Sequence, residues 1–265
     1  MPVAIKHLEF HISHRCNLRC KYCSHYCDFG YSGAIDTTSM IDNIGSWAKR
    51  VAPRQVHILG GEPLLNKDLL LYLDATRGHF PDATLYLVSN GLLLPRWAEA
   101  LPASLLKNDI ILAISEHPYP QSMQGQHDAM VALLSVWKQK IGVIIDHREA
   151  QQKWSKCYQG EGTTIIPYNS DPSQSYTSCL SKKCVTLLHN YLWKCPNIAY
   201  LQFILDKLTH RSQWERFAAY APLGLDSSDT ELERFFDTGA EPCCAMCPEV
   251  LEVVPHVYGD DQKSL

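Results

Sequence analysis

The sequence lacks a long apolar run, a cluster of basic residues and an excess of charge of either sign. Its 265 residues carry 24 lysines and arginines against 28 aspartates and glutamates, a formal net charge of −4. Without a basic stripe, a nucleic-acid surface is not expected, and without a bilayer-length apolar run, neither is a membrane segment. The N-terminus also has no charged-then-apolar leader. We therefore expect a cytoplasmic protein that binds neither nucleic acid nor membrane.

Cysteine, by contrast, is abundant. Eleven cysteines are many for a cytoplasmic chain, because disulfides are disfavoured there and closely spaced thiols usually hold a metal or take part in chemistry. A length of 265 residues fits one domain with a small extension. The cysteines are therefore the first feature to explain.

Short apolar runs alternate with helical segments up to about residue 150, which predicts repeated βα units, an α/β fold and a parallel sheet. The expected strands are 8–13, 55–59, 84–89, 110–115 and 141–146. Four of them run into chemically distinctive groups, namely the first cysteine cluster, Gly60–Glu62, Ser89–Asn90 and Ser115–Glu116. Because ligands bind beyond the carboxyl ends of parallel strands, we expect these groups to form one site.

Cys16, Cys20 and Cys23 form a CxxxCxxC pattern directly after the first expected strand. Three thiolates on one short loop can hold three irons of a 4Fe-4S cluster and leave the fourth iron open to a substrate or cofactor. A zinc site is the alternative, although zinc sites usually pair a CxxC with a second CxxC or with histidines. The histidines nearby in the sequence are His11, His14 and His25.

The CxxxCxxC pattern, with the aromatic Tyr22 before its last cysteine, resembles the signature of the radical SAM superfamily. In that family a glycine-rich acidic motif after the second strand holds the amino group of S-adenosylmethionine (SAM), and Gly60-Gly61-Glu62-Pro63 is similar to it. Glycines let the backbone approach a ligand, and Glu62 can accept hydrogen bonds from an ammonium group. Taken alone, the same four residues predict only a turn.

Three weaker matches follow in the order that the family has. Ser89 and Asn90 match the position that contacts the carboxylate or ribose of SAM, and Ser115 and Glu116 match a ribose contact. Ile144, in the fifth expected strand, is similar to the stretch that packs on adenine. The resemblance implies a partial (β/α)6 TIM-like barrel that binds a 4Fe-4S cluster and SAM. It further implies reductive cleavage of SAM to a 5′-deoxyadenosyl radical, which abstracts hydrogen from a substrate.

The character of the chain changes after about residue 150, and we expect a core over 1–165 and a cysteine-rich extension over 166–265. A hairpin-like segment lies there, with its turn at His189-Asn190. The order of elements resembles the short twitch extension of the SPASM/twitch group of radical SAM enzymes, which implies an auxiliary 4Fe-4S cluster. Its expected ligands are Cys184, Cys195, Cys244 and Cys247. A zinc ribbon would use the same four thiolates. The cysteines then left over are Cys27, Cys157, Cys179 and Cys243.

The resemblance to twitch-type cyclitol dehydrogenases favours oxidation of a small polar molecule, such as a sugar or cyclitol alcohol. Three alternatives stay open: modification of a peptide side chain, epimerisation with Cys157 or Cys179 as hydrogen donor, and a non-enzymatic zinc-binding scaffold. The expected partners are a small-molecule or peptide substrate and an electron donor such as flavodoxin or ferredoxin. No acid–base residue is assigned. Polar candidates near strand ends are Glu9, His11, His117, Asp146, His147 and Arg148.

Overall fold

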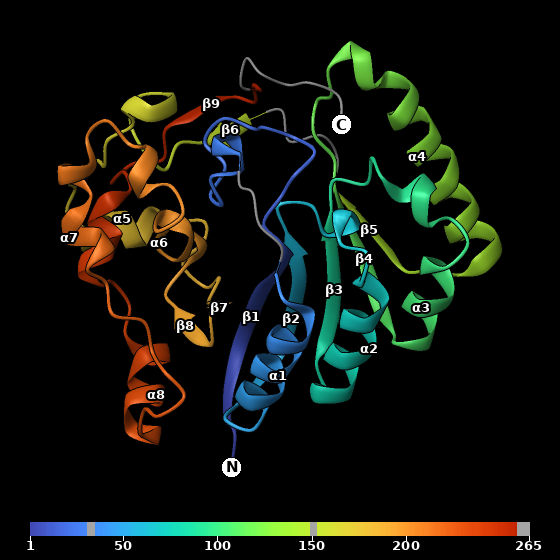
Figure 1. Ribbon diagram of the computed structural model, residues 1–265, viewed down its shortest axis with the longest axis horizontal. Coiled ribbons are helices and arrows are strands. Elements are labelled where there is room, and N and C mark those ends of the chain that lie inside the picture. Colours follow the sequence, from blue (N-terminus) through green and yellow to red (C-terminus); the bar gives the residue numbers. More distant parts are fainter. Residues whose placement is uncertain (31–34, 149–152, 259–265) are drawn as a thin grey trace.

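The computed structural model describes residues 1–30, 35–148 and 153–258 and contains a seven-stranded main sheet (Figure 1). The strand order is β5-β4-β3-β2-β1-β7-β8, with parallel pairing from β5 to β7 and antiparallel pairing of β8 with β7. This sheet confirms the predicted α/β class and the partial TIM-like barrel. The strands are β1 (Val3–Ser13), β2 (Val51–Gly60), β3 (Thr84–Ser89), β4 (Ile110–Ser115), β5 (Ile145–Arg148), β7 (Thr186–Leu188) and β8 (Tyr191–Trp193).

Helices cover one face of this sheet. The side chains of β1 distinguish this helix-covered face from the opposite face. Leu8, Phe10 and Ile12 are buried in the main core against the helices. The alternate residues His7, Glu9 and His11 point to the opposite face, because successive strand residues alternate sides. That opposite face is therefore unusually polar. The helices are α1 (Thr37–Ala48), α2 (Leu69–His79), α3 (Leu101–Lys107) and α4 (Gln124–Val136) (Figure 1).

The first helix illustrates how local sequence sets these elements. The Asp36 side chain caps α1 by accepting a hydrogen bond from Ser39 N at 2.7 Å. The residues Met40, Ile44 and Trp47 follow at helical spacing and are buried against the sheet. Capping by Asp36 and burial of this apolar stripe therefore set where the helix begins and which side it turns to the sheet.

The fifth strand differs from the prediction. Helix α4 continues through a π-helical turn over Trp137–Ile141, and Gly142 ends it in the left-handed conformation at φ 85°. Strand β5 therefore begins only at Ile145. Ile144 is 57% exposed and its carbonyl accepts a hydrogen bond from Leu112 N, well before the carboxyl end of β4. The structure does not support the predicted adenine contact of Ile144.

The C-terminal part of the chain lies along β1 and adds two strands to the main sheet (Figure 1). Strands β7 and β8 form the expected hairpin, and its turn residues His189 and Asn190 both have positive φ, as a two-residue hairpin turn requires. A second hydrophobic core joins Tyr22 and Tyr26 to residues of this part. The remaining elements are α5 (Pro172–Ser178), α6 (Pro196–Leu201), α7 (Glu215–Ala218), α8 (Asp229–Asp237) and the antiparallel pair β6 (Lys153–Ser155) and β9 (Val253–Pro255).

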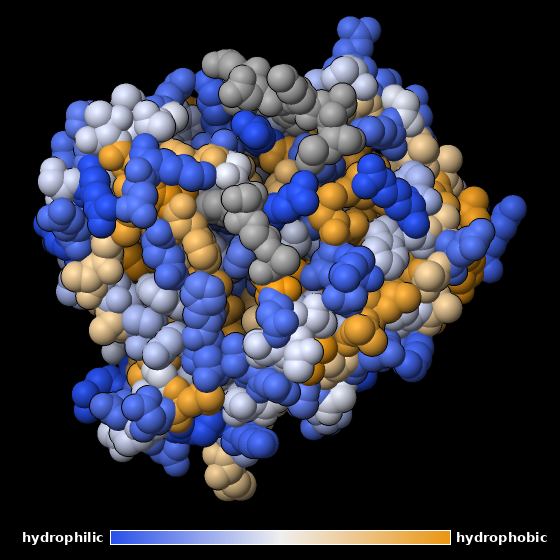
Figure 2. Space-filling model, in the orientation of Figure 1, coloured by the Kyte–Doolittle hydropathy of each residue, from blue (hydrophilic) through white to orange (hydrophobic). Residues whose placement is uncertain are grey.

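On the face drawn in Figure 2, hydrophobic residues occur in separate patches among hydrophilic ones. Within the described ranges, no helix combines the length and apolar character needed to cross a membrane. The large apolar side chains instead fill the two cores, one between sheet and helices and one in the C-terminal part.

Two glycines join the end of β2 to the loop that follows β1. Gly61 N donates to Ser13 O at 2.7 Å, and Glu62 N donates to Arg15 O at 2.8 Å. A Cβ on Gly60 would lie 2.4 Å from Ser13 O, and one on Gly61 would lie 2.4 Å from Arg15 O. Glycine is therefore required here because the chain's own backbone approaches, whereas the sequence suggested the approach of a ligand.

This close approach makes a testable prediction. We expect Gly61→Ala to lower the free energy of unfolding by about 1–3 kcal/mol, because the added methyl group meets backbone that cannot move aside easily. The matched control is Gly78→Ala, at an exposed helical position with open space around it, which should be neutral or stabilise by up to about 1 kcal/mol. Denaturant titration of both variants measures the difference, and equal stabilities would contradict the close-approach interpretation.

Candidate functional site

A cavity lies at the carboxyl ends of β1 to β4 and brings most of the predicted groups together. Parallel strands end at one edge of the sheet, so the loops that follow them meet there. From the predicted set, the cavity is lined by Cys16, Cys20, Cys23, Gly60, Gly61, Ser89, Asn90 and Ser115. Tyr22, Glu62, Glu116 and Ile144 do not line it.

The cysteine loop turns sharply to present its thiols. Tyr22 and Tyr26 adopt left-handed backbone conformations, with φ of 61° and 53°, which are uncommon for residues other than glycine. Hydrogen bonds hold the first of these turns: Tyr22 N donates to the Tyr158 hydroxyl at 2.9 Å, and Trp154 Nε1 donates to Tyr22 O at 2.8 Å. The region 154–158 therefore supports the loop from outside the first βα unit.

A fourth thiol, Cys27, joins the first three. Hydrogen bonds with the thiols of Cys16 and Cys23, followed by burial, raise the pKa of Cys27 well above its usual value. The pKa of Cys23 is lowered, chiefly by the hydrogen bond with Cys27 and, against the effect of burial, by one with His25. Sequence spacing left Cys27 unassigned, since it falls outside the CxxxCxxC pattern.

The carboxylate of Glu62 is engaged inside the protein and does not face the cavity. It accepts hydrogen bonds from Leu64 N at 3.0 Å, from the Ser89 hydroxyl at 2.7 Å and from Asn90 N at 2.9 Å. Burial raises the pKa of Glu62 to about 7 despite these three bonds. The predicted contact between this side chain and an ammonium group is therefore not supported, and Glu62 positions the Ser89–Asn90 turn instead.

Asn90 connects the third strand to the cysteine loop. Its side-chain Nδ2 donates to Asn17 Oδ1 at 2.8 Å, and its Oδ1 accepts from Leu92 N at 3.1 Å. The Tyr119 hydroxyl donates to Asn90 O at 2.6 Å. These bonds fix the turn rigidly beside the thiols.

The two residues predicted to follow β4, Ser115 and Glu116, point to different places. Ser115 lines the cavity, whereas the Glu116 carboxylate lies between His127 Nε2 at 2.8 Å and His147 Nε2 at 2.6 Å. Burial acts to raise the pKa of Glu116, but the hydrogen bonds with the two imidazoles outweigh it and lower that pKa. His117, one of the polar candidates that sequence analysis named near strand ends, lines the cavity, and its Nδ1 is buried without a hydrogen-bond partner in the described part of the chain.

A second cavity lies beside the first and contains Tyr22, Cys157, Cys179 and Cys247. Burial raises the pKa of Cys195, and the nearby Cys247, Cys179 and Cys244 raise it further. The pKa of Cys247 is raised to about 12 by burial, against a hydrogen bond from Asn197, and then by Cys179 and Cys244. The pKa of Cys179 is also raised, first by burial and then by Cys244. Each pair among Cys179, Cys195, Cys244 and Cys247 is therefore close enough to interact electrostatically.

Cys184 stands apart from that group, contrary to the predicted ligand set. Burial raises its pKa, and the largest further cause is the neighbouring Glu9 on β1, ahead of Cys179. Cys184 immediately precedes the segment that pairs with β1, and this pairing turns its thiol toward the sheet. Cys179, which sequence analysis had left over, instead influences the pKa of both Cys195 and Cys247.

The donor sets fit the groups that the sequence resemblance implies. The three thiols of the CxxxCxxC pattern and Cys27 face one cavity, whose other walls combine the Gly60–Gly61 backbone and the Ser89–Asn90 turn with apolar side chains. Three thiols on one loop suit a 4Fe-4S cluster with one open iron. Four mutually close thiols in the second region suit a fully ligated cluster or a zinc ion. No aspartate or glutamate is among the described residues that line either cavity, which argues against a magnesium or calcium site.

Comparison with known proteins agrees with this geometry. The model of the radical SAM superfamily matches residues 10–109. GTP 3′,8-cyclase from Campylobacter jejuni (strain RM1221) is 30% identical over 135 residues, which are 49% of this chain and 42% of that protein. PqqA peptide cyclase from Bradyrhizobium diazoefficiens is 37% identical over 87 residues, 32% of this chain and 22% of that protein. The chain thus matches less than half the length of these curated relatives.

Among solved structures, BtrN in complex with AdoMet and 2-DOIA has a similar fold, with a TM-score of 0.50 and 17% identity over 93% of both chains. The family match contains the three cysteines of the first loop together with Gly60, Gly61, Ser89 and Asn90. Residues 10–109 therefore match the radical SAM superfamily.

Proposed function

We propose that Cys16, Cys20 and Cys23 hold the 4Fe-4S cluster and that SAM binds beside it in the first cavity. The backbone of Gly60–Gly61 and the Ser89–Asn90 turn line the wall next to the thiols and would contact SAM there. When bound and reduced, the cluster and SAM supply a 5′-deoxyadenosyl radical that abstracts a hydrogen atom. Glu62 serves this site indirectly, because its three hydrogen bonds hold the turn in place.

We further propose that Cys179, Cys195, Cys244 and Cys247 hold an auxiliary 4Fe-4S cluster. The observation that supports this set is the mutual electrostatic influence of all four thiols. Cys157 lies between the two regions, since both Cys247 and Cys23 raise its pKa after burial does. The two clusters would therefore be neighbours, with the described ends of α5 and α6 carrying one ligand each.

The proposed reaction is the oxidation of a small polar molecule, such as a sugar or cyclitol alcohol. Loss of a hydrogen atom to the radical removes one electron from the substrate. A two-electron oxidation therefore needs a second electron acceptor. The thiols of the second region support this proposal because they could hold an auxiliary cluster that accepts the second electron. The fold similarity to BtrN, whose structure holds 2-DOIA, is consistent with a substrate of this class. The proposed reductant is flavodoxin or ferredoxin, which would place the reaction in the cytoplasm.

His117 is the acid–base group that lines the first cavity. Its ring stacks on that of His256 at 5.0 Å, and its Nδ1 has no hydrogen-bond partner in the described chain. Burial, followed by His256, lowers the pKa of His117 to about 4, so the imidazole is neutral at pH 7 and able to accept a proton.

Peptide modification is the second candidate function. The match with PqqA peptide cyclase, a protein named for a peptide substrate, favours it. Epimerisation would use Cys157 as hydrogen donor, because burial raises the pKa of this thiol and keeps it protonated. These reactions differ from oxidation in product mass, and a zinc-binding scaffold differs from all of them in iron content.

The first ligand set predicts the effect of Cys23→Ala. Anaerobically reconstituted protein should contain about eight irons per chain, and the variant about four, because one cluster loses a ligand. Its 5′-deoxyadenosine formation from SAM after dithionite reduction should fall to background. Cys243→Ala, which removes a buried thiol outside both ligand sets, should keep the iron. Undiminished 5′-deoxyadenosine from Cys23→Ala would refute the assignment, and colourless wild-type protein would favour the scaffold.

The second ligand set is tested by comparing two cysteines five positions apart. Cys179→Ala should lose about four irons per chain and retain 5′-deoxyadenosine formation, because only the auxiliary cluster is affected. Cys184→Ala should retain the full iron content. Iron analysis with Mössbauer spectroscopy measures both, and the reverse pattern would restore Cys184 as the ligand.

The reaction class is tested with 2-DOIA, the compound bound in the BtrN structure, as the probe. Oxidation yields a product lighter by two hydrogens, whereas epimerisation leaves the mass unchanged and incorporates deuterium from deuterium oxide. His117→Gln should still cleave SAM but form roughly a hundredfold less product, as expected for loss of a general base. If mass spectrometry finds no change in 2-DOIA but a change in a peptide library, the second candidate function replaces the first.

A further inference from the structure

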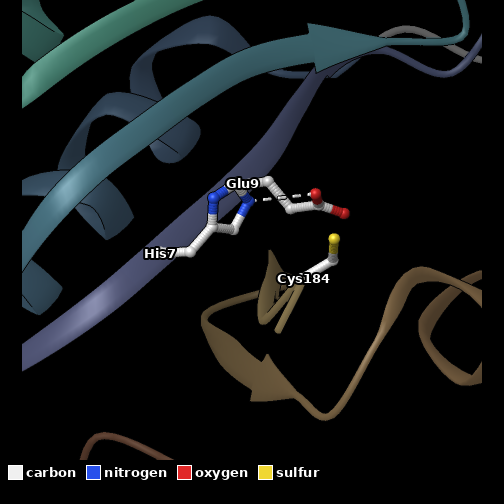
Figure 3. Close-up of side chains that lie close together, drawn as sticks. All are labelled: His7, Glu9 and Cys184. Atoms are coloured by element: carbon white, nitrogen blue, oxygen red, sulfur yellow. Dashed lines mark hydrogen bonds and ion pairs between the residues drawn. The ribbon is translucent and has the colours of Figure 1, made fainter. Parts of the chain in front are cut away.

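Three metal-binding side chains meet on the polar face of the sheet, apart from both cysteine groups. The ligand atoms of His7, Glu9 and Cys184 all lie within 4.8 Å of one another. Figure 3 shows the imidazole and the carboxylate extending from β1 and the thiol of Cys184 directed toward the carboxylate. His7 Nε2 lies 3.3 Å from Glu9 Oε2.

The register between β1 and β7 brings these three side chains together. Glu9 pairs with Thr186 in the parallel β1–β7 ladder, and Glu9 N donates to Val185 O at 2.9 Å. His7 precedes Glu9 by two residues, and Cys184 precedes Thr186 by two. Residues two apart on extended chain share a face, so the same register that pairs Glu9 with Thr186 sets His7 opposite Cys184.

The charges of this group are poorly compensated by the protein alone. Glu9 is only 4% exposed, and in the described part of the chain its ion pair is with His7, with no lysine or arginine beside it. Burial and Glu9 together raise the pKa of the Cys184 thiol. Buried carboxylates and thiolates are normally paired with cations or bound to a metal, and a divalent cation between them would neutralise both.

The surroundings would hold such ligands in orientation. The Thr186 hydroxyl donates to Glu9 Oε1 at 3.1 Å, which leaves Oε2 turned toward His7. The ring of His57 on β2 packs edge-on against His7 at 4.3 Å. Hydrogen-bonded carboxylates and packed imidazoles are the usual support of metal ligands.

We propose that His7, Glu9 and Cys184 bind one Zn²⁺ ion. The combination of thiolate, imidazole and carboxylate suits zinc, whose bonds of about 2.0–2.3 Å leave a fourth position for water. The ion bridges β1 and the residue that leads into β7. It thereby fastens the segment between Cys179 and Cys195 to the barrel, and it requires neither of the iron-sulfur assignments to be correct.

Zinc analysis of the full-length chain tests this proposal. Anaerobically reconstituted protein is incubated with ZnCl2, desalted, and measured for zinc and iron by mass spectrometry and for zinc ligation by zinc K-edge X-ray absorption. We expect about one zinc per chain, with one sulfur neighbour at about 2.3 Å and nitrogen or oxygen neighbours at about 2.0–2.1 Å. Cys184→Ser and His7→Gln should each lower zinc affinity by roughly tenfold or more, with iron unchanged.

Cys157→Ser is the matched control, because it also removes a buried thiol but lies away from the three ligands. It should keep both metals. Wild-type protein without zinc, zinc surrounded by four sulfurs, or unchanged zinc binding in both ligand variants would each overturn the proposal. His7→Gln retains every cysteine, so its loss of zinc cannot come from a damaged iron-sulfur site, and circular dichroism confirms that each variant is folded.

Discussion

The pairing of β1 with β2 on one side and with β7 on the other determines where every reactive group lies. At its carboxyl end, β1 leads into the first cysteine loop, which the Gly60–Gly61 turn contacts through two backbone hydrogen bonds. Along its length, β1 presents His7, Glu9 and His11 to the polar face. Through β7 it anchors the chain that carries the second group of cysteines. A change of register at β1 would therefore displace all three groups together.

Electrostatics explains why these groups need cations. Burial raises the pKa of Cys20, Cys195 and Cys247 above the ordinary value, whereas hydrogen bonds with a neighbouring thiol lower the pKa of Cys23 and Cys244. Several thiolates in one apolar region repel each other, so the protein alone favours their protonated forms. Metal binding reverses this preference because a coordinated thiol is deprotonated outright. The folded chain thus resists ionisation of Cys20, Cys195 and Cys247, which a metal would ionise, and binding must release protons.

Short-range patterns in the sequence were sufficient for much of the fold. The periodicity predicted four of the five early strands within a few residues, and the hairpin turn at His189-Asn190 followed from apolar runs on both sides. Side-chain direction was less accessible. Glu62 turns inward because three donors surround it, and Glu116 turns to two histidines that come from α4 and β5. Hydrogen-bond partners that lie far away in the sequence produce no local sequence pattern. The prediction therefore relied on motif position alone and assigned both carboxylates to the cofactor.

The exchange of Cys184 for Cys179 has the same physical origin. Spacing alone does not distinguish two cysteines that both precede β7, but the pairing of β7 with β1 sets the side-chain direction of the residue nearer to the strand. Cys184 is two residues before Thr186, so its thiol is fixed toward the face of Glu9. Cys179 follows the last residue of α5 and lies outside any strand, so the loop can direct its thiol to the other cysteines. Strand register, and not the number of intervening residues, therefore decides which thiol lies near the other cysteines and which lies near a histidine and a carboxylate.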